Sequence, residues 1–194
     1  MTKLTSEEAL RKLMDGNQRF VSQKPIHPNQ NMDRVREIRN GQNPFAMILG
    51  CSDSRVPPEI IFDQGLGDIF VIRVAGNILD ETVIASAEYA AEHLGVSLLM
   101  VLGHGNCGAV TAAIEGGRHQ GSIHRLIKAI DPAIRMSKYK AGDTLANAIE
   151  ANVLMVVDQL QSSKPILSHL HQNGSLKIIG ALYDMESGKV GILI

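Results

Sequence analysis

The sequence predicts an α/β fold in which a mostly parallel central β-sheet is flanked by helices. Three short runs, at 45–50, 68–76 and 97–103, are almost entirely apolar, and segments with helical patterns alternate with them. Strands of this kind are typical of a parallel sheet that is covered on both faces. At the end of the chain, two apolar runs around "ESGK" within 175–194 predict an antiparallel hairpin at one edge of the sheet.

The N-terminal part of the chain predicts a helix followed by an irregular arm. In "TSEEALRKLMDGNQRFV" (5–21), Thr5 and Glu8 are placed to form a capping box, and an apolar stripe follows them. Residues 22–44 are polar and are interrupted by prolines, which favours an extended arm with a short helix near 34–39.

Later segments also have the apolar spacing of helices. Two of them have clear ends, because 81–95 closes with Gly95 and 107–117 closes with a pair of glycines. The others are 122–137, 143–161 and 165–172. Their alternation with the apolar runs is what indicates a layered α/β arrangement rather than a bundle.

Length and composition favour one folded domain. The chain has 194 residues, of which 44% are hydrophobic, and this is enough for a sizeable core. The sequence shows no repeat, low-complexity tract or linker. We therefore expect a single domain over 1–194, with an N-terminal helical arm at 1–44 and an α/β core at 45–194.

The charge balance argues against two classes of partner. The 19 basic and 20 acidic side chains leave a formal net charge of −1, which gives no support for a nucleic-acid or anionic-membrane partner. No apolar run approaches the roughly 18–20 residues of a membrane-spanning helix. Acidic residues also stand where a secretory signal would have its apolar region. We therefore expect a cytoplasmic protein with no nucleic acid and no membrane among its partners.

Chemically capable side chains follow two of the predicted strands. "CSDSR" (51–55) comes directly after the first apolar run, and "GHGNCG" (103–108) follows the third. Because ligands of open α/β sheets bind beyond the carboxyl ends of the strands, we expect the two stretches to meet. Two thiols, an imidazole and a carboxylate suit tetrahedral zinc. The donors are Cys51, Asp53, His104 and Cys107.

The local spacing of these donors supports a common site. Cys51 and Asp53 are two apart on an extended chain, so their side chains share a side. Cys107 would lie near the start of a helix, where the helix dipole favours a thiolate. The glycines of "GHGNCG" let the backbone turn tightly. Both cysteines of the chain lie in these stretches, which makes the combination more specific than either spacing alone.

A dinucleotide site is the alternative interpretation of "GHGNCG". The stretch fits G-x-G-x-x-G after a strand and before a helix. That fingerprint also requires a second strand that closes with an acid about 20 residues further on. The residues that follow predict a loop and a helix, and the first acid beyond them, Asp131, stands before a proline. The sequence therefore favours the metal site.

Arg55 bears on whether a metal site would be structural or catalytic. A structural zinc keeps its four protein ligands, whereas a catalytic zinc keeps one position open. Arg55 keeps its charge and offers Asp53 a bidentate partner other than the metal. Asp53 could then leave the metal and admit water, which favours catalysis. The alternative is that Arg55 only anchors the loop.

The two stretches, with their surroundings, resemble the β-class carbonic anhydrases, in particular the bacterial members. The matching segments are "CSDSRVPPEIIFDQGLGDIFVIRVAGN" (51–77), "SAEYAAEHLGVSLLMVLGHGNCGAV" (86–110) and the N-terminal "GNQRF". The resemblance covers most of the chain. It implies an enzyme for the reversible hydration of carbon dioxide to bicarbonate and a proton.

The resemblance also implies roles for individual residues. One zinc ion (Zn2+) per chain would be held by Cys51, His104 and Cys107. Asp53 and Arg55 would form the catalytic dyad, with Asp53 a zinc ligand in a closed state only.

A substrate pocket is implied in the same way. Gln42 matches a glutamine that hydrogen-bonds the substrate, and Phe70 and Tyr89 match residues of the apolar carbon dioxide pocket. Gly108 is placed with these substrate-binding residues. In the family this pocket spans a subunit boundary and the N-terminal arm wraps a neighbour, so the resemblance implies a homodimer or homotetramer. Its small-molecule partners would be carbon dioxide and bicarbonate.

The chain departs from the family pattern at two places. Gly105 stands where many members have serine or threonine, so a hydroxyl role is missing there. Gly50, Arg73 and Tyr183 fit a subgroup that bicarbonate regulates, but Ile48 stands where that subgroup has tryptophan.

Two other functions remain compatible with these motifs. Carbonyl sulfide and carbon disulfide are linear and close in shape to carbon dioxide, so a hydrolase for them could use the same scaffold. A non-catalytic structural zinc module for protein interaction is the alternative outside enzymes.

Overall fold

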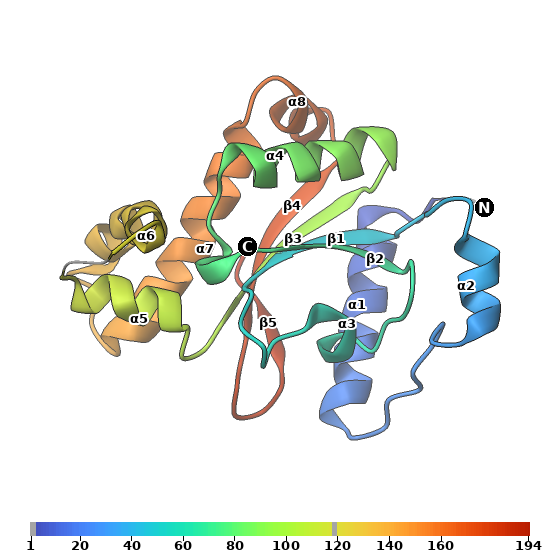
Figure 1. Ribbon diagram of the computed structural model, residues 1–194, viewed down its shortest axis with the longest axis horizontal. Helices are drawn as coiled ribbons and strands as arrows, with labels where there is room; N and C mark the ends of the chain where they lie inside the picture. Colours follow the sequence, from blue (N-terminus) through green and yellow to red (C-terminus); the bar gives the residue numbers. More distant parts are fainter. Residues whose placement is uncertain (1–2, 118–119) are drawn as a thin grey trace.

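The computed structural model describes residues 3–117 and 120–194, and in these residues a five-stranded sheet forms the centre of the molecule (Figure 1). The strand order is β2-β1-β3-β4-β5. The first four strands pair in parallel, and β5 pairs antiparallel to β4 at the edge. The predicted fold class is therefore confirmed. The strands are β1 (Ala46–Gly50), β2 (Ile69–Arg73), β3 (Leu98–His104), β4 (Lys177–Tyr183) and β5 (Val190–Ile192).

Helices surround this sheet, and each predicted helix is present. They are α1 (Ser6–Val21), α2 (Met32–Ile38), α4 (Glu81–Glu88), α5 (Gly108–Glu115), α6 (Ile123–Ser137), α7 (Thr144–Ser162) and α8 (Ile166–Gln172). A π-helical turn, Tyr89–His93, continues α4, and a 3₁₀ turn, Ala75–Asn77, follows β2. The short α3 (Pro58–Ile61) was not predicted, because four residues are too few to show helical spacing.

The central strands β1 and β3 are buried on both faces, as their apolar sequences require, whereas the edge strands β2 and β5 are partly exposed. Alternate residues of β1 and β3 enter two separate clusters, with Ile48 and Met100 in one and Leu49 and Val101 in the other. The first cluster includes side chains from α1, α5 and α6, and the second includes side chains from α4, α7 and α8. Within the described residues no helix has both the length and the apolar character to cross a membrane.

The N-terminal arm is only partly packed on the sheet of its own chain. Thr5 and Glu8 form the predicted capping box, in which each backbone N–H donates to the other side chain. Ala9 and Leu13 of α1 are fully buried in the first cluster. In contrast, α2 has no buried residue and lies at the side of the molecule (Figure 1).

Asp63 fastens the arm to the core. Its side chain is fully buried, and its carboxylate accepts hydrogen bonds from Arg19 Nε at 2.6 Å and from the backbone N–H groups of Ile26 and His27, each at 3.0 Å. Burial alone would raise the pKa of Asp63, but these hydrogen bonds outweigh burial and hold the pKa below its usual value. The ionised form is therefore the one that stabilises the fold.

We expect Asp63→Asn to lower the free energy of unfolding by about 2–3 kcal/mol at pH 7, because an amide cannot satisfy three donors as a carboxylate does. The depressed pKa means that the contribution of Asp63 is fully present above the unfolded-state value, about 3.9, and is lost as pH falls through the folded-state pKa. Urea unfolding at a series of pH values should therefore show the two proteins converging below about pH 4.

Asp33→Asn is the matched control for this measurement. Asp33 pairs with Arg36 on α2, and its side chain is 84% exposed. We expect a change within about 0.5 kcal/mol. An equal loss in both variants, or a loss at Asp63 that does not depend on pH, would contradict the assignment.

Candidate metal centre

The parallel pairing of β1 with β3 brings the two motifs together. Gly50, the last residue of β1, lies opposite Leu102 of β3, so the carboxyl ends of both strands lie at the same end of the sheet. Cys51 follows β1 directly, His104 is the last residue of β3, and Cys107 is the N-cap of α5. The potential donor atoms of these three residues lie within 4.8 Å of one another, and all three residues are buried.

The pKa values of the two cysteine thiols are shifted in opposite directions. The neighbouring Cys107 side chain holds the pKa of the Cys51 thiol well below its usual value, against the effect of burial, and the Gly76 N–H, which donates to Cys51 Sγ, acts in the same direction. The Cys51 side chain, together with burial, raises the pKa of the Cys107 thiol. These surroundings favour the thiolate form at Cys51, and the thiolate is the form that binds metals.

His104 directs a lone pair at the two sulfurs. Its Nδ1 lies 2.8 Å from the carbonyl oxygen of Gly105, which can only accept a hydrogen bond, so Nδ1 carries the proton. The other ring nitrogen, Nε2, is then an acceptor. It is buried and has no hydrogen-bond partner among the described residues. Two sulfurs and an unpaired imidazole nitrogen form the ligand set of a zinc site that keeps one position open.

Asp53 and Arg55 form a bidentate ion pair beside these donors. Arg55 Nε donates to Asp53 Oδ1 at 2.9 Å, and Arg55 Nη2 donates to Asp53 Oδ2 at 2.7 Å. The guanidinium also donates to the carbonyl oxygen of Asn106 at 3.2 Å, so it bridges the two motifs. Asp53 Oδ2 lies 4.0 Å from His104 Nε2. The Arg55 guanidinium holds the pKa of the Asp53 carboxyl well below its usual range, although burial acts in the opposite direction.

Three of the predicted substrate residues lie away from the donors within one chain. Gln42 is exposed in the segment that precedes β1, at the opposite end of that strand from Cys51. Phe70 pairs with Met47, four residues before Cys51, which places Phe70 about 13 Å back along the sheet. The ring of Tyr89 is 6.3 Å from that of Phe70 and the residue is 47% exposed.

Gly108 has a different position from these three. It is the first residue of α5, directly after Cys107, and a Cβ there would meet no atom within 4 Å. Its backbone therefore borders the donor set, and the space beside it is open.

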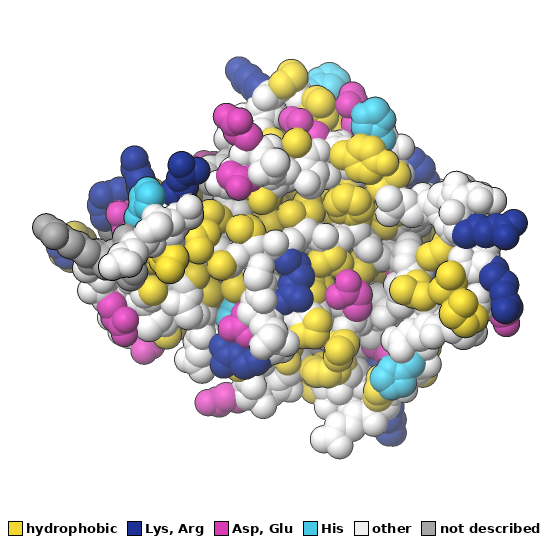
Figure 2. Space-filling view, viewed as in Figure 1, with side chains coloured by type: hydrophobic (Ala, Val, Ile, Leu, Met, Phe, Trp, Pro, Cys, Tyr) yellow, Lys and Arg dark blue, Asp and Glu magenta, His cyan; other side chains and the backbone are white. Residues whose placement is uncertain are grey.

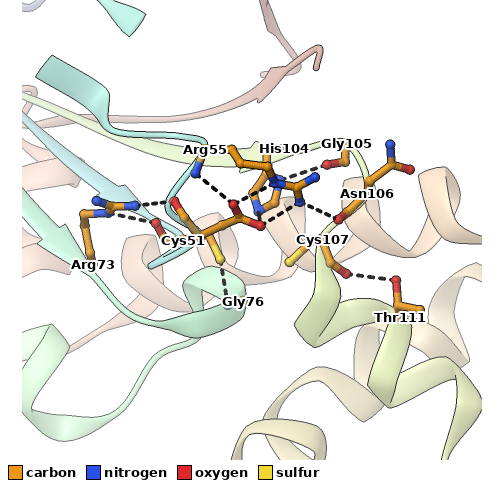
Figure 3. Close-up of polar contacts among 10 residues, drawn as sticks. Cys51, Arg55, Arg73, Gly76, His104, Gly105, Asn106, Cys107 and Thr111 are labelled. Carbon is orange, nitrogen blue, oxygen red and sulfur yellow. Dashed lines mark hydrogen bonds and ion pairs between the residues drawn. The ribbon is translucent and has the colours of Figure 1, made fainter. Parts of the chain in front are cut away.

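Two residues, Arg73 at the end of β2 and Gly76 in the turn after it, hold the Cys51 loop, a role that was not predicted from the sequence. Arg73 donates from Nε to the carbonyl oxygen of Cys51 at 2.9 Å and from Nη2 to that of Asp53 at 2.6 Å. The N–H of Gly76 points at Cys51 Sγ, with the nitrogen 3.3 Å away (Figure 3). The available signal was a glycine three residues after the end of β2, where the chain turns: Gly76 has a φ of +69°, a conformation that favours glycine.

Comparison with known proteins agrees with this geometry. The sequence model of the family described as "Carbonic anhydrase" matches residues 46–190. A carbonic anhydrase of Mycolicibacterium smegmatis is 40% identical over 187 residues, which are 94% of this chain and 90% of that protein. Carbonic anhydrase 2 of Mycobacterium tuberculosis is 38% identical over 93% of this chain and 89% of its own.

Solved structures give the same result for the fold. The β-carbonic anhydrase of Coccomyxa, in complex with acetazolamide, has a TM-score of 0.76 and 26% identity, covering 95% of this chain and 86% of that one. A tetrameric β-carbonic anhydrase of Sordaria macrospora has a TM-score of 0.76 at 23% identity, covering 95% and 96%. With its fold, its convergent donors and these relatives, the chain belongs to the β-class carbonic anhydrase family.

Proposed function

We propose that this chain catalyses the reversible hydration of carbon dioxide to bicarbonate and a proton, with one zinc ion held by Cys51, His104 and Cys107. The observation that carries the proposal is the unpaired Nε2 of His104, which faces two buried sulfurs beside a fixed carboxylate. When bound, zinc supplies Lewis acidity that lowers the pKa of a coordinated water and makes it nucleophilic at moderate pH.

The protein's own groups orient the reaction. Asp53 is ionised and acceptor-only, and Arg55 fixes both of its oxygens. Oδ2 retains lone pairs on the side of His104, so it can accept a hydrogen bond from the attacking water. That hydrogen bond would direct the remaining lone pair of the water oxygen at the carbon of the substrate. Arg73 keeps the carboxylate in place by holding the backbone on which it stands.

Asp53 is also the residue that would close the site. In this structure the carboxylate pairs with Arg55, 4.0 Å from His104 Nε2. We propose that the same carboxylate is a fourth metal ligand in a closed state, and that Arg55 competes with the metal for it. The bidentate geometry favours the arginine, because both carboxylate oxygens are satisfied at once.

The direct test combines stopped-flow hydration of carbon dioxide with metal analysis. We expect one zinc per chain and hydration activity in the wild type, and loss of both in Cys107→Ala, because two ligands cannot replace three. Carbonyl sulfide and carbon disulfide, assayed in parallel, decide whether a related gas is the better substrate. Bound zinc without turnover of any of the three gases would instead indicate a structural zinc module.

We expect Arg55→Ala to retain zinc but to lower the hydration rate by about 100-fold or more, because Asp53 loses the partner that orients it. Arg55→Lys should recover part of the rate, since an ammonium ion keeps the charge but cannot form the bidentate pair. Arg125→Ala, at an exposed site on α6, is the control and should leave the rate unchanged. Full activity in Arg55→Ala would remove the pair from the mechanism.

We also propose that the working unit is a homodimer or homotetramer in which one copy completes the site of another. Gln42, Phe70 and Tyr89 lie far from the donors of their own chain, and β2 is an edge strand. The exposed apolar side chains of Met32 and Val35 on α2 form a surface of the kind that a second copy would cover. Figure 2 shows hydrophobic side chains gathered on this part of the molecule.

Mixed oligomers test whether the site is shared. We expect Cys107→Ala and Tyr89→Ala chains to have little activity alone, and about a quarter of wild-type activity when coexpressed in equal amounts. About half of the dimers are then mixed, and one of the two sites in each mixed dimer is intact. Cys51→Ala with Cys107→Ala is the matched control, since all donors come from one chain, and it should show no recovery. Equal behaviour of the two mixtures would place the whole site within one chain.

Two broader features belong to the same proposal. The first cluster contains side chains of both α1 and the sheet, which supports one domain over the whole chain. We propose a cytoplasmic location, supported by the two free cysteines, since reduced thiols are usual in that compartment.

A further inference from the structure

Asn152 is a buried polar residue for which packing alone gives no account. It lies in the middle of α7, is 1% exposed, and is followed by the buried Val153. Its Nδ2 donates to the carbonyl oxygen of Gly76 at 2.9 Å, across 76 positions of sequence. Its Oδ1 has no hydrogen-bond partner among the described residues. A leucine would fill a similar volume without burying an unpaired acceptor, so the amide needs another explanation.

The residue that Asn152 holds is the one that contacts a metal donor. Gly76 donates its N–H to Cys51 Sγ, and its carbonyl accepts from Asn152. The carbonyl can only accept, which fixes the orientation of the amide with Nδ2 towards Gly76. A continuous chain of contacts thus leads from the interior of α7 to the sulfur.

The turn that contains Gly76 is held from several sides. The N–H of Asn77 closes the turn on the carbonyl of Val74 at 2.9 Å. A Cβ at Gly76 would lie 2.9 Å from Ile130 Cδ1 and 3.1 Å from Ala109 Cβ, so α5 and α6 pack directly on this glycine. Asn152 fixes the remaining freedom, because it holds the peptide that follows Gly76. Small displacements of this turn would move the N–H away from Cys51.

We propose that Asn152 is a positioning residue for the metal centre, which fixes the Gly76 turn so that its N–H donates to Cys51 Sγ. This inference rests on the proposed zinc site. A hydrogen bond to a ligating sulfur withdraws negative charge from it and fixes its position, and such outer contacts tune both the affinity for the metal and its electronic properties.

The test replaces Asn152 by leucine and measures the metal rather than the reaction. We expect the dissociation constant for zinc, measured by competition with a coloured chelator, to rise about 10–100-fold. In the cobalt-substituted protein, the sulfur-to-cobalt charge-transfer band should move to longer wavelength, because a sulfur without its hydrogen bond releases electrons more easily. Asn152→Ser, which is smaller and polar, should change both quantities in the same direction.

Asn17→Ala is the matched control. Asn17 is also a buried asparagine, and it donates to the carbonyls of Ile61 and Gly188 and accepts from the N–H of Val190. Its loss should lower the melting temperature without changing the zinc affinity or the cobalt spectrum. If Asn152→Leu behaves like this control, with reduced stability and an unchanged metal centre, the inference is wrong.

Two further outcomes are distinguishable. A wild-type protein that binds no zinc would overturn the proposed function itself, whereas a wild-type zinc site that is insensitive to Asn152 overturns this inference alone. If neither Asn152 variant folds, the wild type loaded with NMR-active cadmium decides the question. We expect a scalar coupling between the metal and the amide proton of Gly76. Its absence would overturn the inference, because the Gly76 N–H would then not donate to the ligating sulfur of Cys51.

Discussion

The parallel pairing of β1 with β3 is the constraint on which the site depends. Because Gly50 lies opposite Leu102, the carboxyl ends of both strands lie at the same end of the sheet. Cys51 and His104, which are 53 positions apart in sequence, therefore become neighbours. An antiparallel pairing would place these two residues at opposite ends of the sheet. A slip of one residue would turn every side chain of β1 to the other face of the sheet, so the way these side chains are buried fixes the register. The apolar strands thus determine the metal geometry, although they contribute few ligands.

Around the buried site, most of the described polar groups have hydrogen-bond partners, and one acceptor does not. The backbone around the donors is tied by hydrogen bonds, from Arg73 to the Cys51 loop and from Gly76 to the sulfur. Asp53 is satisfied by Arg55. His104 Nε2 is the exception within the described part of the site, and an unpaired buried acceptor is costly. A bound cation removes that cost, so the energetics of the fold and the affinity for a metal act in the same direction.

Much of this could be predicted from the sequence, for identifiable reasons. Apolar runs of strand length, each followed by polar side chains, are sufficient to place Cys51 and His104 at strand ends. The contributions of Asn152 and Gly76 could not be predicted, because their contact joins segments 76 positions apart and depends on how α7 packs. The hold of Arg73 on the Cys51 loop likewise depends on how β2 pairs with β1, and α3 is too short for its periodicity to be recognised.

The position of Phe70 and Tyr89 has a consequence for how activity and assembly are related. These aromatic residues are partly exposed near the β2 edge of the sheet, while the donors lie beyond the carboxyl ends of β1 and β3. If an apolar pocket for a small gas is built from both sets, no single chain contains a complete site. Substrate binding then stabilises the assembled form over the separate chains by mass action, as any ligand of a shared site must. Contacts at the subunit boundary would therefore influence turnover even where they touch neither metal nor substrate.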